Sequence, residues 1–186
     1  MRKQQDVYYR SKSYELGEII SFTGTHGVGK TTSVYELAYK YKLNYPDKTV
    51  YTLNEVARNS PYTLNKKSCE QGQLWIFNEQ IKQELELITY YDYIITDRTA
   101  VDNIAYSSVY GFNKLCECMF NMLGFHVGTY SKIYFKTIEN NDFAVNDGVR
   151  ESDDLEFRQN VENELIKLYN KLTEMNYLKE DIIEYI

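Results

Sequence analysis

Residues 24–31 form a glycine-rich segment whose residue types and spacing are those of a phosphate-binding loop. The segment reads Gly-Thr-His-Gly-Val-Gly-Lys-Thr, which fits the pattern G-x-x-x-x-G-K-[ST] at every fixed position. Backbone N–H groups in such a loop point inward and form a nest for an anion. The start of the helix that follows adds partial positive charge. The sequence therefore predicts a binding site for the phosphates of a nucleotide.

Within this loop, each residue type has its own expected role. The glycines let the backbone approach phosphate oxygens because no Cβ is in the way. We expect Lys30 to bridge the β- and γ-phosphates of the nucleotide and the Thr31 hydroxyl to bind Mg²⁺. The residues expected to contact the nucleotide are Gly24, Thr25, His26, Gly27, Val28, Gly29, Lys30, Thr31 and Thr32.

A second candidate metal residue follows an apolar run of four residues. Residues 93–96 read Tyr-Ile-Ile-Thr and precede Asp97, which is the pattern of a buried strand that ends in an acid. We expect Asp97 to orient Mg²⁺ through a bound water. The next residue, Arg98, is expected to bind the acceptor's phosphate or the charge that develops on the transferred group. The alternative for Arg98 is a surface arginine paired with an acid.

The end of the preceding β-rich run, residues 48–53, carries Glu55 and Arg58. If the acceptor is an alcohol, Glu55 can take its proton. If the acceptor is a phosphate, no such base is required, and Arg58 suits an anionic acceptor. The two residues point to different acceptors and leave the choice open. The alternative for Glu55 is a solvated strand end.

Two further residues have a structural alternative to their functional role. Asp102 lies three residues after Thr99, so it fits either a helix-capping box or a substrate contact. Trp75 lies near the start of a long helical pattern, where its ring can stack on a base or pack in the core.

Residues 139–155 are polar and contain Asn146-Asp147-Gly148, so we expect a mobile lid there. Arginines on a closing loop neutralise charge in the transition state. Arg150 in this segment and Arg158 on the following helix are the candidates. The alternative for Arg158 is an ion pair with Glu162 or Asp154 on its own helix.

The order of the predicted elements indicates the fold. Strands expected at residues 19–22, 48–53, 92–97, 131–136 and 181–186 alternate with helical patterns. In the long helix expected after the polar loop at residues 59–67, the predicted apolar stripe is Leu74, Phe77, Ile81, Leu85 and Ile88. Alternation of this kind predicts a single α/β domain over residues 1–186, a three-layer α/β/α structure with five parallel strands in the order 2-3-1-4-5. Ligands of such sheets bind beyond the carboxyl ends of the strands.

Composition limits the choice of partners. The chain has 186 residues and a formal net charge of -6, which is not the charge expected of a protein that binds duplex DNA. No apolar run reaches the length of a membrane span. Three cysteines without a secretion signal indicate a reducing cytoplasm.

Taken together, five motifs resemble a known group of proteins. They are residues 24–32, Glu55 to Arg58, residues 73–77, Thr96 to Arg98 with Asp102 and Tyr106, and residues 147–150. In this order they resemble the small AAA-like ATPase/kinase family related to nicotinamide-riboside kinases, within the P-loop nucleoside and nucleotide kinases. The resemblance covers about residues 18–186 and implies ATP as phosphate donor, Mg²⁺ as cofactor and a nucleoside-like acceptor.

The expected activity is transfer of the γ-phosphate of ATP to a nucleoside, a deoxynucleoside monophosphate or a related hydroxyl. One alternative is a kinase that acts on DNA, at a 5′ end or a hydroxymethylated base, although the net charge argues against DNA. Another is a nucleotide-dependent switch without a small acceptor. A GTP switch needs Asn-Lys-x-Asp after the fourth strand, and the residues there read Thr137-Ile138-Glu139-Asn140. We expect no membrane partner, and a homodimer is compatible with this interpretation.

Overall fold

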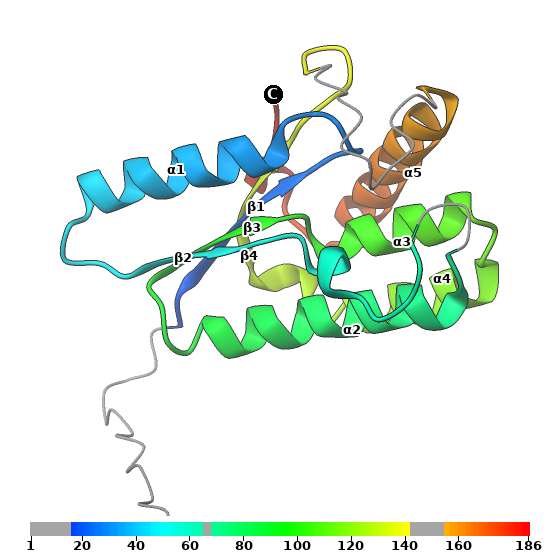
Figure 1. Ribbon diagram of the computed structural model, residues 1–186, viewed down its shortest axis with the longest axis horizontal. Coiled ribbons are helices and arrows are strands. Elements are labelled where there is room, and N and C mark those ends of the chain that lie inside the picture. The colour runs from blue at the N-terminus through cyan, green and yellow to red at the C-terminus, as the bar shows by residue number, and fades with distance from the viewer. Residues whose placement is uncertain (1–15, 65–67, 142–154) are drawn as a thin grey trace, which may run out of the picture.

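The computed structural model describes residues 16–64, 68–141 and 155–186, and these residues form one parallel sheet (Figure 1). Its strands are β1 (Glu18–Thr23), β2 (Val50–Leu53), β3 (Tyr93–Asp97), β4 (Tyr130–Phe135) and β5 (Ile183–Tyr185). Their order is β2-β3-β1-β4-β5, and each neighbouring pair is parallel. The predicted order of five strands is confirmed.

Helices cover both faces of the sheet, as a parallel sheet requires. Helix α1 (Lys30–Asn44) packs on one face. The other face is covered by α2 (Glu70–Leu87), α3 (Ala100–Val109), α4 (Asn113–Leu123) and α5 (Leu155–Glu174). Short 3₁₀ turns lie at η1 (Val56–Asn59), η3 (Val127–Thr129) and η4 (Glu180–Ile182). The three-layer arrangement is confirmed, with one helix in the thinner layer (Figure 1).

Side chains of the central strands alternate between two hydrophobic cores. Ile20, Phe22 and Ile95 face α1, whereas Ile19 and Ile94 face α2 to α5. Both sets are almost fully buried, and burial of each such side chain contributes about 1.5–3 kcal/mol. This double burial explains why the strands read as continuous apolar runs rather than as alternating patterns.

The buried face of α2 differs from the predicted apolar stripe. Two members of that stripe, Leu74 and Leu85, are 39% and 46% exposed. The face that points into the protein instead includes three polar residues, Gln73, Gln80 and Glu84. The prediction of the stripe was wrong in this respect because hydrogen bonds inside the protein satisfy these polar groups, so apolar spacing alone misplaced the face.

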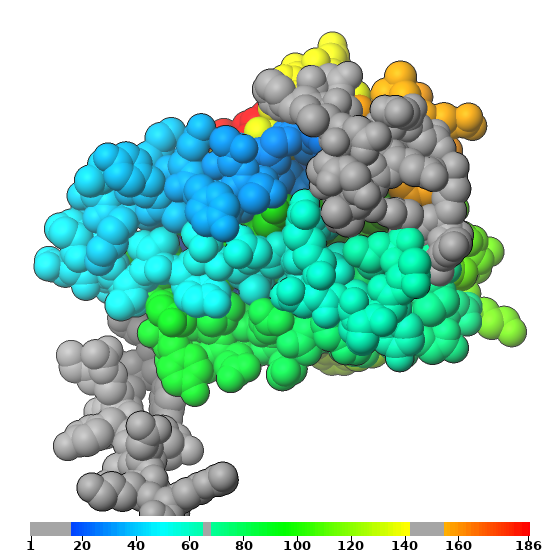
Figure 2. Space-filling view, in the orientation of Figure 1, coloured from blue at the N-terminus to red at the C-terminus, as the bar shows by residue number. Residues whose placement is uncertain are grey.

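Strands β1, β2 and β3 end at the same edge of the sheet. The register pairs Phe22 of β1 with Asp97 of β3, and Leu53 of β2 with Thr96 of β3. The loops that follow the three strands therefore start side by side. In Figure 2 a gap remains between the blue start of α1 and the cyan-to-teal segment after β2, with green atoms from the middle of the chain at its bottom.

Candidate functional site

The backbone of the loop after β1 has the conformation that only glycine adopts readily. Gly24, Gly27 and Gly29 have φ angles of 134°, 77° and 72°, all in the region that L side chains avoid. A Cβ on Gly24 would also lie 2.4 Å from the carbonyl oxygen of Lys136. The glycines of the motif are therefore required by the path of the loop.

The loop leads directly into α1, whose first turn carries no acidic side chain. The N-cap is Gly29, and within the described residues no side chain caps this helix start. The first N–H groups of a helix have no acceptor inside the helix and attract anions. This helix start is therefore suited to bind phosphate oxygens, as the sequence predicts.

Lys30 is buried against the loop that it follows. Its Nζ donates to the carbonyl oxygen of Gly24 at 2.9 Å and to that of Thr25 at 2.6 Å. Burial, assisted by the charge of Arg98, lowers the pKa of Lys30 to about 7. An anion placed in the loop would restore the charged form of this amine.

Thr31 and Asp97 form a direct contact between the loop and the end of β3. The Thr31 hydroxyl donates to Asp97 Oδ2 at 2.5 Å. A hydroxyl and a carboxylate are hard oxygen donors, which suit Mg²⁺, so this pair fits the expected metal. Over the described ranges, no cluster of three or more His, Cys, Asp or Glu side chains could hold a metal. With Thr31 as the direct protein ligand and Asp97 holding a bound water, the other ligands of a Mg²⁺ ion here would be waters and phosphate oxygens.

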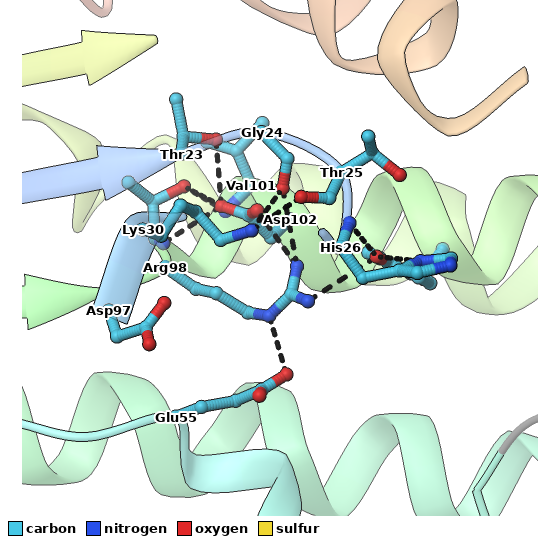
Figure 3. Close-up of polar contacts among 12 residues, drawn as sticks. Thr23, Gly24, Thr25, His26, Lys30, Glu55, Asp97, Arg98, Val101 and Asp102 are labelled. Carbon is cyan, nitrogen blue, oxygen red and sulfur yellow. Dashed lines mark hydrogen bonds and ion pairs between the residues drawn. The ribbon is translucent and has the colours of Figure 1, made fainter. Parts of the chain in front are cut away.

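Arg98 joins the ends of three strands (Figure 3). Its Nε donates to Glu55 Oε1 at 2.7 Å, and its Nη1 donates to Asp102 Oδ1 at 3.2 Å and to the Gly24 carbonyl at 3.5 Å. The side chains of Arg98 and Glu55 are only 7% and 5% exposed. Glu55 is therefore not a solvated strand end, and Arg98 is not a surface residue.

The backbone of Arg98 has an unusual conformation for its residue type. Its φ angle is 90°, which costs a side-chain-bearing residue on the order of 1–3 kcal/mol. The Arg98 N–H donates to the Phe22 carbonyl of β1 at 2.9 Å, and its own carbonyl accepts from Thr96 Oγ1 at 2.8 Å. The surrounding hydrogen bonds therefore hold Arg98 in this strained conformation.

Tyr106 of α3 links Arg98 to the phosphate loop. Its hydroxyl oxygen accepts from the His26 backbone N–H at 3.1 Å and from Arg98 Nη2 at 3.3 Å. The guanidinium carbon of Arg98 lies 4.8 Å from the centre of the Tyr106 ring, a cation–π contact. Tyr106 was named among the motifs of the family resemblance, without a role, and it lies one helical turn after Asp102.

The other predicted residues on this side of the site lie as follows. Arg58 is half-exposed, and its Nε donates to Glu55 Oε2 at 3.2 Å. Asp102 is fully buried, and the capping box with Thr99 is present. Trp75 is partly buried against the core on the α2 face. Stacking of Trp75 on a base and contact of Asp102 with a substrate stay predictions.

Arg158 of α5 contacts the phosphate loop. It is 2% exposed, and its Nε donates to the His26 carbonyl at 3.1 Å. Arg158 therefore supports the loop, and its role as a lid residue stays a prediction. Arg150 and residues 142–154 of the predicted lid lie outside the described residues.

Lys136 lies directly after β4, at the opposite side of the loop from Glu55. Its Nζ donates to Ser33 Oγ of α1 at 2.9 Å, and burial lowers the pKa of Lys136. Lys136 was not predicted as a site residue, although the rule that functional residues follow strand ends applies to it.

Comparison with known protein families gives this arrangement a context. A family model described as an AAA domain matches residues 19–180 of the chain. The chain belongs to this AAA-domain family. Among curated proteins, none matches the sequence of this AAA domain.

Solved structures show that this AAA domain has the fold of nucleoside and nucleotide kinases. Deoxyadenosine kinase from M. mycoides, with dCMP and dCDP bound, is 18% identical with a TM-score of 0.58, and the match covers 90% of this chain and 89% of the kinase. Thymidylate kinase from Ehrlichia chaffeensis is 20% identical with a TM-score of 0.55, and the match covers 91% of this chain and 92% of that kinase. NadR protein, in complex with NAD and AMP-PNP, is 16% identical with a TM-score of 0.64, and the match covers 91% of this chain and 44% of NadR.

Of the helices in residues 16–64, 68–141 and 155–186, none combines the length and the apolar character needed to cross a membrane.

Proposed function

We propose that this AAA domain is an ATP-dependent phosphotransferase that moves the γ-phosphate to a nucleoside, a deoxynucleoside monophosphate or a related hydroxyl. The observation that carries the proposal is the buried pair of Glu55 and Arg98, held beside Lys30 and Asp97 at one edge of the sheet. A nucleotide-binding loop alone explains Lys30 and Thr31. It does not explain a carboxylate and a guanidinium buried next to it.

The donor side of the proposed reaction uses the loop and the start of α1. The loop amides and Lys30 bind the phosphates of ATP, and Lys30 neutralises charge on the β- and γ-phosphates. Thr31 would bind Mg²⁺ directly and Asp97 would hold one of its waters, and the ion would supply charge neutralisation between the β- and γ-phosphates. Contact between these two side chains keeps them in place for this role.

The acceptor side uses Glu55 and Arg98. As the acceptor oxygen forms its bond to the γ-phosphorus, the bond from that phosphorus to the β,γ-bridging oxygen breaks and ADP leaves. If the acceptor is an alcohol, its proton passes to a carboxylate oxygen of Glu55. The Arg98 guanidinium, fixed by Glu55 and Asp102, neutralises charge on the transferred group. If the acceptor is a nucleotide, the half-exposed Arg58 is a second cation for its phosphate.

The comparisons support this class of acceptor. A deoxyadenosine kinase and a thymidylate kinase share the fold over most of both chains. One phosphorylates a nucleoside and the other a nucleotide, as their names state, so the fold accommodates both acceptors. The choice between them in this chain rests on Glu55 and Arg58.

The test is transfer of labelled phosphate from ATP, in the presence of Mg²⁺, to a panel of acceptors. The panel holds nucleosides, deoxynucleoside monophosphates, nicotinamide riboside, 5′-hydroxyl DNA and DNA with hydroxymethylated bases. We expect transfer to at least one small acceptor and its near abolition in Lys30→Ala, since the γ-phosphate loses its main cation. Lys40→Ala, on the outer part of α1, is the matched control.

Other outcomes would overturn the proposal in distinct ways. Label found only on DNA would indicate a DNA kinase. ATP turnover that is indifferent to every acceptor, together with nucleotide-dependent capture of a protein, would indicate a switch.

A cytoplasmic location is part of the proposal. The three cysteines of the chain, Cys69, Cys116 and Cys118, are unbonded thiols, which suit a reducing compartment.

A further inference from the structure

A buried polar network lies next to the proposed active site, on the α2 face of the sheet. Its centre is Glu84 of α2, which is fully buried, and Gln80, one turn earlier, is 2% exposed. A buried carboxylate is costly unless hydrogen bonds compensate for lost water. The described contacts of Glu84 provide that compensation, and they lead toward Arg98.

Four side chains make up the network. Glu84 Oε2 accepts from the Tyr130 hydroxyl at 2.9 Å and lies 2.5 Å from His126 Nε2. Glu84 Oε1 accepts from Gln80 Nε2 at 2.7 Å. The same Gln80 nitrogen donates to the carbonyl oxygen of Arg98 at 3.4 Å. Both carboxylate oxygens are thus used, and one end of the network contacts the Arg98 main chain.

The network also contacts the main chain on the far side of Arg98. The Tyr130 hydroxyl oxygen accepts from the Ala100 N–H at 2.9 Å. Burial and the nearby Glu84 raise the pKa of Tyr130, so its hydroxyl keeps the proton that it donates to Glu84. The peptide groups of Arg98 and Ala100 are therefore both tied, through Gln80 and Tyr130, to one carboxylate on α2.

The main chain of residues 98–100 needs contacts that hold it in place, because Arg98 has a positive φ angle. In the described residues, Asn176 is the other non-glycine residue with positive φ, and asparagine tolerates that conformation. An arginine relaxes to negative φ unless its surroundings prevent it. Relaxation would turn its guanidinium away from Glu55 and Asp102.

We propose that Gln80, Glu84 and Tyr130 are positioning residues of the phosphotransfer site. They hold the main chain of residues 98–100 so that the Arg98 side chain lies between Glu55, Asp102 and the phosphate loop. They touch neither nucleotide nor acceptor, and they act through Arg98. The expected effect of these residues on turnover rests on the proposed function. Their expected effect on the position of the Arg98 side chain does not.

The test replaces Gln80 by methionine, which keeps the length of the side chain and removes the amide. We expect Gln80→Met to lower kcat about 10- to 100-fold, as misplacement of a reacting group does, while KM for ATP stays within about twofold. The NMR signal of the Arg98 Nε–H, assigned by its loss in Arg98→Lys, should move in Gln80→Met. Gln83→Met is the control, because Gln83 lies on the same helix and donates to Glu79.

A second variant covers the case in which Gln80→Met does not fold. Tyr130→Phe removes only the hydroxyl, and we expect it to move the same NMR signal and to lower kcat with little change in KM for ATP. An unmoved Arg98 signal in the folded variants would overturn the proposal. A moved signal with wild-type kcat would overturn the role in the reaction.

The NMR measurement also separates this inference from the proposed function. If the unaltered protein transfers no phosphate to any acceptor, the proposed function fails. A moved Arg98 signal in Gln80→Met would still support the positioning of Arg98 by the network, and an unmoved signal would overturn it.

Discussion

Arg98 Nε lies 2.7 Å from Glu55 Oε1, so an ion pair joins the end of β3 to the end of β2. The two side chains are almost fully buried, and loss of one member of such a pair costs about 3–5 kcal/mol because the other charge stays buried alone. The pair also places one acid and one cation beside Lys30.

Glu55→Gln is expected to slow transfer to an alcohol acceptor by about 10²-fold or more, since general base catalysis contributes this much. ATP affinity should stay close to that of the unaltered protein, because Glu55 acts on the acceptor in our proposal. The amide oxygen of glutamine can still accept from Arg98, so the variant should fold. Steady-state kinetics measures the rate of transfer, and calorimetry with ATP measures the affinity. Turnover equal to that of the unaltered protein would rule out Glu55 as the base.

Asp97→Asn is expected to raise the Mg²⁺ concentration needed for half-maximal activity about 10-fold or more, as loss of an outer ligand does. The reason is that asparagine keeps the shape but loses the charge that holds a metal-bound water. A Mg²⁺ titration of turnover at saturating ATP measures the change. Asp92→Asn, directly before the start of the same strand, should leave the titration as it is. An identical Mg²⁺ dependence in Asp97→Asn would exclude this role.

Lys30 makes nucleotide binding depend on pH. Because burial lowers its pKa to about 7, the amine is largely neutral in the free protein above that pH, and bound phosphates restore its charge. ATP binding at about pH 8 should therefore take up a fraction of a proton, and binding at about pH 6 should take up almost none. Calorimetry in two buffers of different ionisation enthalpy measures the uptake. Lys30→Met should abolish it.

Burial of the Lys30 charge is also expected to lower the free energy of unfolding. The pKa of Lys30 falls from 10.5 in the unfolded chain to about 7 in the folded protein, so the unfolded state binds more protons between these values. The cost of burying the charge is fully present below about pH 7 and fades as pH rises toward 10.5. Lys30→Met should raise the free energy of unfolding by about 2–4 kcal/mol below pH 7, and less at higher pH. Urea unfolding of both proteins across this range is the measurement, and a gain that grew with pH would contradict the argument.

Asp92 fastens the start of β2 to the start of β3. Its carboxylate accepts from the Thr49 N–H and hydroxyl at 2.8 Å each and from Lys48 Nζ at 2.9 Å, and these bonds, the backbone N–H first, lower the pKa of Asp92 to about 2. Asp92→Asn should lower the free energy of unfolding by about 1 kcal/mol. The contribution is present above the ordinary value of 3.8 and is lost as pH falls toward 2. Asp47→Asn, on the neighbouring turn, is the control, and equal unfolding curves at neutral pH would contradict the prediction.

The sequence by itself determined the phosphate loop, the alternation of strands and helices, and the order of the sheet. These features are local or follow from few topological rules: glycines at fixed positions allow a loop with positive φ, and parallel strands with helical crossovers leave few arrangements. Asp97 and Arg98 were identified for the same reason, because residues at strand ends meet at one edge of the sheet.

Only the tertiary structure decided how these residues contact each other. The pairing of Arg98 with Glu55 joins residues on two separate strands, and no local pattern encodes which acid an arginine selects. Gln80 and Glu84 lie on the buried face of α2, outside the expected apolar stripe. A buried polar group is tolerated only where partners satisfy it, and those of Glu84 are distant in the sequence. Those partners, His126 and Tyr130, lie more than 40 residues away, so the network that supports Arg98 exists only once the chain has folded.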